Sequence, residues 1–174
     1  MIHKWSRYAV LELFFDFPRK KWLVRELSRT ARIATTSVRI HLNELLKDEI
    51  IIKERDGLYP SFSANRQNEY YKMLKKQNTV LRIYLTGIIH IIEKATYPKC
   101  VVLFGSASRG EDDETSDIDL FVQSKQVPVP LQQYEKKLKR TISLLFEPDI
   151  KELGAELINN IINGEVLYGY LKVK

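Results

Sequence analysis

The spacing of apolar residues in the first fifty positions predicts three helices. Apolar residues are dense from Trp5 to Phe15, enough for a helix with a wide buried face. A brief extended piece at Trp22-Leu23 separates this helix from a second, short one over Val24–Thr30. A hydroxyl from Thr35 or Thr36 can cap the start of a third helix, because Thr accepts hydrogen bonds from the free N–H groups of a first turn.

The third helix has one apolar and one polar face. Its apolar residues fall at i, i+4, i+7 and i+8 and predict a buried stripe: Val38, Leu42, Leu45 and Leu46. The outer face carries Thr36, Ser37, Arg39, Ile40 and Asn43. Two helices joined by a tight turn, the second with a polar and basic outer face, form the helix-turn-helix pattern.

A predicted β-hairpin follows these helices. Ile50–Arg55 is expected as a strand, Asp56-Gly57 is a strong hairpin-turn signal, and Leu58–Phe62 returns as a second strand. Helices followed by a basic hairpin predict a winged helix-turn-helix that resembles those of small prokaryotic regulators, especially archaeal ones. Winged helices also serve as protein-interaction modules, so that alternative stays open. The candidate DNA-binding residues are Thr36, Ser37, Arg39, Asn43, Lys53 and Arg55.

The pattern divides the chain into three parts. Residues 1–64 form the predicted winged helix-turn-helix domain, and residues 65–97 form a helical connector. Within the connector, Asn65–Lys76 is polar, whereas Thr79–Ala95 is apolar on most sides; it could pack on a sheet or pair with its copy in a homodimer. From residue 98 to 174 the pattern changes to strand, turn and strand, so we expect an α+β or α/β domain with a mixed sheet.

The C-terminal part begins with two strands that place two carboxylates together. The apolar run Val101–Phe104 breaks at Gly105-Ser106, and a second strand starts at Asp117. Successive side chains of a strand alternate between faces, so Asp117 and Asp119 lie on the same side. Two like charges that close repel each other unless a divalent cation such as Mg²⁺ joins them. The glycine allows a phosphate to approach the backbone closely.

Later segments complete this domain. A basic helix is expected over Gln132–Arg140, a third strand over Ile142–Phe146 and an amphipathic helix over Ile150–Ile162. The last of these is closed by Asn163-Gly164 as its C-cap.

Each half of the two-strand pattern is also compatible with an ordinary turn and a solvated strand edge. Their conjunction is much rarer: Gly105-Ser106, then Arg109-Gly110, then Ser116-Asp117-Ile118-Asp119-Leu120. Together these motifs resemble the signature of the minimal nucleotidyltransferases, which belong to the DNA polymerase β-like nucleotidyltransferase superfamily. The resemblance covers Lys99 to Tyr170.

The resemblance implies both a site and an activity. Gly105 and Ser106 would hold a nucleoside triphosphate with help from Arg109, and Asp117 and Asp119 would bind Mg²⁺ or Mn²⁺. A nucleoside monophosphate would pass from the NTP to an acceptor hydroxyl. Minimal nucleotidyltransferases that modify a paired HEPN-domain protein imply such a partner, as in toxin–antitoxin systems.

One departure from the family pattern concerns the third carboxylate that its active members use. Counting back from the family-like ending at residues 163–168 puts that position at Ser143, and serine is a poor metal ligand and no base. Glu147 or Asp149 could substitute if the register slips. The alternative function is therefore a DNA-binding transcriptional regulator whose nucleotidyltransferase domain is weak or inactive and only binds nucleotide.

Charge and composition sharpen this interpretation. The net charge of +6 is an N-terminal property: residues 1–80 hold 16 Lys and Arg against 9 Asp and Glu, and residues 81–174 hold 12 against 13. A basic N-terminal half favours contact with nucleic acid, although a solvated basic face gives the same count. We find no run of eighteen apolar residues and no signal peptide, and the single Cys100 predicts a core residue. The default location is cytoplasmic, with no membrane partner.

Overall fold

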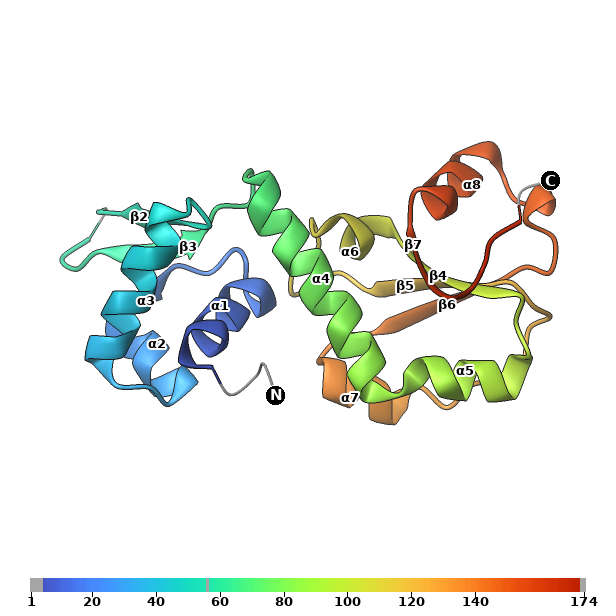
Figure 1. Cartoon of the computed structure of the whole chain (residues 1–174), viewed down its shortest axis with the longest axis horizontal. Coiled ribbons are helices and arrows are strands. Elements are labelled where there is room, and N and C mark those ends of the chain that lie inside the picture. Colours follow the sequence, from blue (N-terminus) through green and yellow to red (C-terminus); the bar gives the residue numbers. More distant parts are fainter. Residues whose placement is uncertain (1–4, 56, 173–174) are drawn as a thin grey trace. The chain divides into compact units, whose positions relative to one another are not determined.

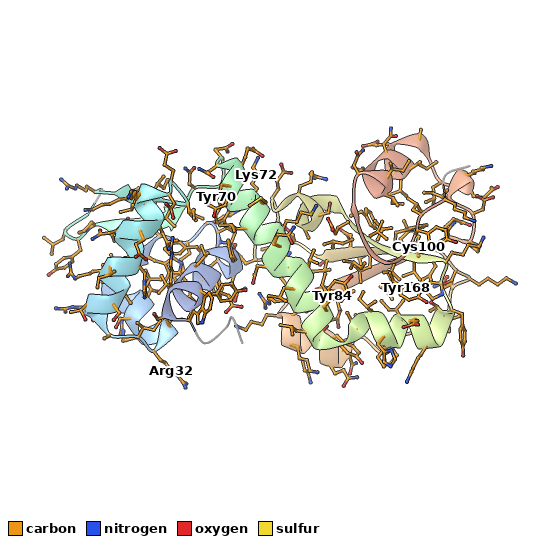
Figure 2. The ribbon with its side chains drawn as sticks, viewed as in Figure 1. Arg32, Tyr70, Lys72, Tyr84, Cys100 and Tyr168 are labelled. Carbon is orange, nitrogen blue, oxygen red and sulfur yellow. The ribbon has the colours of Figure 1, made fainter. Side chains whose placement is uncertain are left out.

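The structure is a computed structural model, and it describes residues 5–55 and 57–172. The chain divides into two compact units, residues 1–75 and 76–174. The division falls within one long helix, α4 (Glu69–Thr86), which lies inside the predicted connector. Figure 1 shows the elements of both units, and Figure 2 adds their side chains in the same view. Each unit is described separately.

The first unit contains three helices and a three-stranded antiparallel sheet in the order β1-β3-β2. Its elements are α1 (Ser6–Asp16), β1 (Trp22–Leu23), α2 (Val24–Ala31), α3 (Thr35–Lys47), β2 (Ile51–Glu54) and β3 (Ser61–Ala64). The three predicted helices and the brief extended piece at Trp22-Leu23 are thus confirmed. The predicted stripe of α3 is also confirmed, with Val38, Leu42 and Leu45 buried and Leu46 partly buried against the same core.

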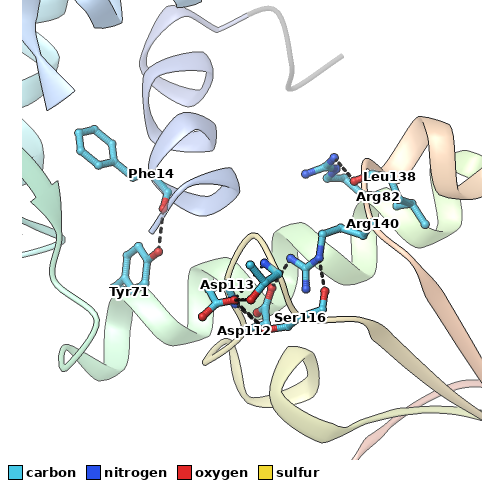
Figure 3. A network of polar contacts seen from close by, with 9 residues as sticks. Phe14, Tyr71, Arg82, Asp112, Asp113, Ser116, Leu138 and Arg140 are labelled. Atoms are coloured by element: carbon cyan, nitrogen blue, oxygen red, sulfur yellow. Dashed lines mark hydrogen bonds and ion pairs between the residues drawn. The ribbon is translucent and has the colours of Figure 1, made fainter. Parts of the chain in front are cut away.

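The start of α4 is tied to α1 by a hydrogen bond. The buried Tyr71 hydroxyl donates to the carbonyl oxygen of Phe14 at 2.8 Å, and Figure 3 shows this contact. Phe14 lies in the last turn of α1, where carbonyl groups have no partner within the helix. The Tyr71 ring also packs on Phe15, with 5.6 Å between the ring centroids.

The predicted N-cap of the third helix is wrong. Ala34 occupies the N-cap position, and no side chain caps it. Thr35 already belongs to α3, and its hydroxyl lies 3.2 Å from that of Ser28. Ser28 in turn donates to the carbonyl oxygen of Ile33, so the hydroxyl groups serve the turn between α2 and α3 instead.

The predicted hairpin is longer than expected. Glu54 pairs with Ser61, so the return strand begins at Ser61 and not at Leu58. Leu58 is 89% exposed, and Pro60 has no N–H for a sheet hydrogen bond. Asp56, half of the predicted turn, lies outside the described residues.

The second unit is built on a four-stranded sheet in the order β6-β5-β4-β7. Strands β5 and β6 are parallel and the other pairs are antiparallel, which confirms the predicted mixed sheet. Beyond α4, the elements are α5 (Ile88–Thr96), β4 (Cys100–Phe104), α6 (Gly105–Arg109), β5 (Ile118–Val122), α7 (Gln132–Leu138), β6 (Ile142–Phe146), the 3₁₀ helix η2 (Ile150–Glu152), α8 (Ala155–Ile162) and β7 (Glu165–Gly169).

Helices cover both faces of this sheet. In Figure 1, α5 and α7 lie on one side of the strands and α8 lies on the other. The α5 and α7 face buries alternate strand residues such as Val101, Leu103 and Leu120. The α8 face buries the intervening residues, among them Cys100 and Phe121. Cys100 is fully buried, as predicted for a core residue.

Three predicted helix boundaries in this unit are wrong. Thr79 does not start a helix, because α4 runs through it; the break comes at Gly87, whose positive φ of 80° separates α4 from α5. The basic helix ends at Leu138, so Arg140 lies outside it. The last helix is interrupted at Gly154, which serves as the N-cap of α8. Strand β7, which follows α8, was not predicted.

Candidate functional site

The register of the sheet aligns three residues of neighbouring strands at one end of those strands. Asp119 on β5 pairs with Phe104 on β4 and with Ser143 on β6. Phe104 is the last residue of β4, so the turn at Gly105 begins beside Asp119. Asp117 comes directly before β5 and is exposed. We call this end of the sheet, with Asp117, Asp119 and Ser143, the acidic end.

The Gly105 turn is fitted closely to the Asp119 carboxylate. Gly105 has a positive φ of 71°, which disfavours any side chain. A Cβ atom at this position would lie 2.5 Å from Oδ2 of Asp119. A side chain at this position would collide with the carboxylate. Glycine therefore allows the backbone at the start of α6 to lie directly against Asp119.

The charged side chains at the acidic end shift the pKa of Asp119 in opposite directions. Burial raises the pKa of Asp119 above its ordinary value, and the neighbouring charge of Asp117 raises it further. The Arg140 guanidinium lowers the pKa of Asp119 and partly offsets both effects. Two carboxylates whose ionised forms repel each other are chemically suited to a divalent cation. Among the described residues, however, no group of three or more His, Cys, Asp or Glu side chains could hold a metal ion.

The acidic loop before β5 is ordered by its own side chains. One carboxylate oxygen of Asp113 accepts hydrogen bonds from the Thr115 backbone N–H at 3.0 Å and from the Thr115 hydroxyl at 2.7 Å. The Ser116 hydroxyl accepts a bond from the Asp113 backbone N–H at 2.9 Å. Asp113 is buried, so this loop is not the solvated segment that its charges suggest.

Arg140 lies just before β6 and links the start of that strand to the acidic loop. Its Nε donates to the Ser116 carbonyl oxygen at 2.5 Å, and its Nη1 donates to Oδ2 of Asp112 at 2.9 Å (Figure 3). The side chains are 14% and 2% exposed, so the pair is largely shielded from water. Ser116 directly precedes Asp117, and Arg140 therefore positions the entry into β5. Sequence reasoning placed Arg140 at the end of a basic helix and missed this role.

The three nucleotide-binding residues predicted from the sequence differ in their position and in their exposure. Gly105 begins α6, and Ser106 follows it and is half-buried. Arg109 is exposed, and its Nε pairs with Glu111 at 2.8 Å. The structure thus brings Gly105 against Asp119 and pairs Arg109 with an acidic neighbour.

Neither alternative for the third carboxylate lies at the acidic end. The backbone N–H of Glu147 donates to the carbonyl oxygen of Val122, the last residue of β5. Because β5 and β6 run parallel, Glu147 and Asp149 lie at the end of these strands opposite to Asp117. Ser143, which is exposed and in register with Asp119, is the residue of β6 beside the carboxylates.

An open groove of about 440 Å³ adjoins the acidic end. Asp117 lines it together with Ser116 and Arg140, and further charges of both signs come from Glu114, Glu135, Lys136 and Lys139. The groove gives a ligand access to Asp117 from the side of α7.

The predicted DNA-contacting residues lie on the surface of the first unit. Thr36, Arg39 and Asn43 are exposed on α3, whereas Ser37 is half-buried. Lys53 is exposed on β2, and Arg55 is exposed just after it.

Comparison with known proteins bears on the second unit. Residues 86–171 match the family described as "Polymerase beta, Nucleotidyltransferase". This match supports a place in the nucleotidyltransferase superfamily for this part of the chain, and the mixed sheet fits that fold. No curated protein and no solved structure matches the chain significantly. Within the described residues, we find no helix with the length and apolar character needed to span a membrane.

Proposed function

We propose that the second unit binds a nucleoside triphosphate with Mg²⁺ or Mn²⁺ and transfers a nucleoside monophosphate to an acceptor hydroxyl. The single observation that carries this proposal is the fit of Gly105 against the Asp119 carboxylate. Around it, the start of α6 and two carboxylates converge at one edge of the sheet. This combination supplies backbone donors for phosphate oxygens next to ligands for a hard cation.

The residues present fit a divalent cation, because the pKa of Asp119 is raised first by burial and then by the charge of Asp117, and a cation would offset both effects. Asp117 and Asp119 would hold the ion, which when bound supplies positive charge against the phosphate oxygens. Gly105 and Ser106 would present backbone N–H groups to the triphosphate. Arg140 would keep Asp117 in place through the carbonyl oxygen of Ser116.

The acceptor hydroxyl would approach through the groove beside Asp117. By the family resemblance, we propose a side-chain hydroxyl of a partner protein, of the kind that carries a HEPN domain. Lys136 and Lys139 line this groove together with Glu114 and Glu135, so a partner surface with charges of both signs would match it.

A second function is favoured by Ser143. With serine in register with Asp119, the edge lacks a carboxylate that could act as general base. In this alternative the second unit binds nucleotide without transferring it, and the protein acts as a DNA-binding regulator. The two functions are compatible in one protein.

We further propose that residues 1–64 form a winged helix-turn-helix that contacts duplex DNA. The order helix, strand, helix, helix, strand, strand supports this proposal, as does the exposed polar face of α3. Arg39 would extend from α3 into the major groove of the DNA. Lys53 and Arg55 would contact DNA phosphates from the hairpin. Thr36, Ser37 and Asn43 would complete the surface.

Calorimetry with each of the four NTPs, with and without Mg²⁺, tests the nucleotide site. We expect metal-dependent binding that the double substitution Asp117→Ala/Asp119→Ala abolishes. The control is Asp48→Ala, which removes an exposed carboxylate from the first unit. α-Labelled NTP incubated with candidate partners then separates transfer from binding alone. Label transfer that persists in the double variant would place the chemistry elsewhere.

Fluorescence anisotropy with a labelled duplex tests the DNA surface. Affinity should fall steeply with salt, because each neutralised phosphate releases counterions. The triple variant Arg39→Ala/Lys53→Ala/Arg55→Ala should bind more weakly and lower the salt slope by about 1 for each lost phosphate contact. A control triple, Lys94→Ala/Lys125→Ala/Lys137→Ala, removes the same charge from the second unit. Equal losses in both triples would contradict the proposed surface.

A further inference from the structure

A second cavity of about 500 Å³ lies in the same unit as the acidic end but at the other end of its sheet. Lys99 precedes β4, Gln123 follows β5, Lys151 follows β6 and Lys172 follows β7. Since β5 runs from Asp119 toward Gln123, this cavity and the acidic end lie at opposite ends of the same strand. We call it the lysine cavity.

Hydrogen bonds and packing contacts join the segments that form this cavity. The Lys99 N–H donates to the Gln123 carbonyl oxygen at 3.0 Å. The Gln123 side chain, only 5% exposed, reaches the Pro148 carbonyl oxygen at 3.4 Å with its Nε2. Leu171 packs against the core under α8 and thereby fixes the segment that carries Tyr170 and Lys172. The cavity therefore has a buried amide among its lining residues and walls from separate parts of the fold.

The charges in the lysine cavity are mostly positive. Three lysines line it, and the carboxylate among its lining residues is that of Asp149. Asp149 accepts a hydrogen bond from the backbone N–H of Lys151 at 3.1 Å, and so already serves η2. In the described parts of the chain, none of the three lysines forms an ion pair, and Lys172 lies over the Tyr170 ring at 5.4 Å from its centroid.

We propose that the lysine cavity binds a small anion that carries two or more linked phosphates, as in an inorganic or nucleoside diphosphate. Three ammonium groups around one concave surface match a compact group with several negative charges, because lysine binds phosphate as a point charge. The same three positive charges would repel a divalent cation, so a cation is not the expected ligand. The volume is within the range of small-molecule sites. The exposed face of Tyr170, 67% accessible, can pack on the nucleoside of a larger ligand.

This site is independent of the nucleotidyltransferase proposal, since it shares no residue with the acidic end. The experiment therefore uses the full chain with Asp117→Ala/Asp119→Ala, in which binding at the acidic end is removed. Inorganic pyrophosphate is titrated by calorimetry at low ionic strength, without divalent cations. We expect saturable one-to-one binding that weakens as salt is added.

Substitutions then locate the binding. Lys99→Ala/Lys151→Ala/Lys172→Ala in this background should weaken pyrophosphate binding at least about tenfold, because the ammonium charges that attract the anion are gone. The control triple Lys94→Ala/Lys125→Ala/Lys137→Ala has the same net charge and should bind as before. Equal weakening in both triples, or no saturable binding before substitution, would overturn the proposal.

A measurement without lysine substitutions guards against misfolded variants. In ¹H–¹⁵N spectra, pyrophosphate should shift the backbone signals of Lys99, Gln123 and Lys151, and ADP should additionally shift that of Tyr170. Shifts confined to residues near Asp117 would refute the site. A single-stranded oligonucleotide that binds more tightly than both probes and shifts the same signals would overturn the assignment to a small anion.

Discussion

The two ends of the sheet in the second unit differ in the sign and in the compensation of their charges. At the acidic end, Asp117 and Asp119 repel each other, and Arg140 offsets part of that repulsion. At the lysine cavity, three cations surround a surface to which Asp149 contributes the carboxylate. The strands between the two ends are apolar. The comparison shows two charged sites of opposite sign at the two ends of one apolar sheet: the lysine cavity has Asp149 as its counter-charge, and the acidic end has Arg140.

The largest effect should come from removing that counter-charge. Arg140→Gln removes one charged partner of the buried Asp112 carboxylate, and breaking such a pair costs about 3 kcal/mol of unfolding free energy. Urea denaturation measures it. The control is Arg109→Gln, which breaks the exposed pair with Glu111 and should cost less than about 1 kcal/mol. Equal losses would show that the internal pair has no special weight.

The next effect would make the acidic end more acidic. Ser143→Asp places a third carboxylate in register with Asp119. General acid–base assistance is worth about 10²–10⁴-fold in rate, so any transfer activity should rise by about 10²-fold. Binding of Mg²⁺ should also tighten, while the metal-free protein loses stability because three acids repel one another.

Activity assays, calorimetry with Mg²⁺ and melting curves in EDTA check this prediction. Glu147→Gln is the control at the opposite end of β6, and it should leave Mg²⁺ affinity unchanged. A Ser143→Asp protein with unaltered Mg²⁺ affinity and an unaltered metal-free melting temperature would separate Ser143 from the site.

A smaller effect concerns the shape of the acidic end. Gly105→Ala should destabilise the protein by about 2 kcal/mol, because a left-handed backbone conformation is unfavourable for alanine. The added Cβ also displaces the Asp119 carboxylate, so Mg²⁺ binding should weaken. Gly57→Ala is a matched control, since nothing lies within 4 Å of the added atom there. If both variants melt and bind alike, the close fit of Gly105 is unimportant.

The smallest effect should depend on pH. The pKa of Asp119 is raised in the folded state, so its protonated form is favoured by folding; that contribution is present at low pH and is lost as pH rises through the raised pKa. Without metal, Asp119→Asn should therefore melt above wild type at neutral pH. The difference should vanish below the ordinary pKa of an aspartate. Melting curves in EDTA at several pH values measure it, and a constant difference would exclude the ionisation of Asp119 as the cause.

The sequence was informative where the relevant residues are close along the chain. Gly105-Ser106 and Asp117–Asp119 each form a local pattern, from which strand alternation predicted two neighbouring carboxylates; the Asp117 charge does act on Asp119. The helices of the first unit followed from apolar spacing in the same way. Local propensity and periodicity act over a few residues, so they can be read without knowing the fold.

Pairings across long stretches of sequence could not be read in this way. Arg140 contacts Ser116 and Asp112, which lie 24 and 28 residues before it. The sequence pattern extended the basic helix to Arg140, because nothing local marks the end of α7 at Leu138. The two buried acids of the loop were likewise unpredictable, since their partners come from elsewhere in the fold or from the turn itself.

Cys100, the single cysteine of the chain, lies in the core under α8. Burial raises the pKa of its thiol to about 11. At pH 7 only about one molecule in ten thousand then carries the thiolate, which is the form that reacts with alkylating reagents. The wild-type protein should thus resist maleimide labelling while folded. A cysteine introduced at an exposed position such as Ser143 could be labelled selectively, so the native chain already serves as a background for site-specific spectroscopic probes.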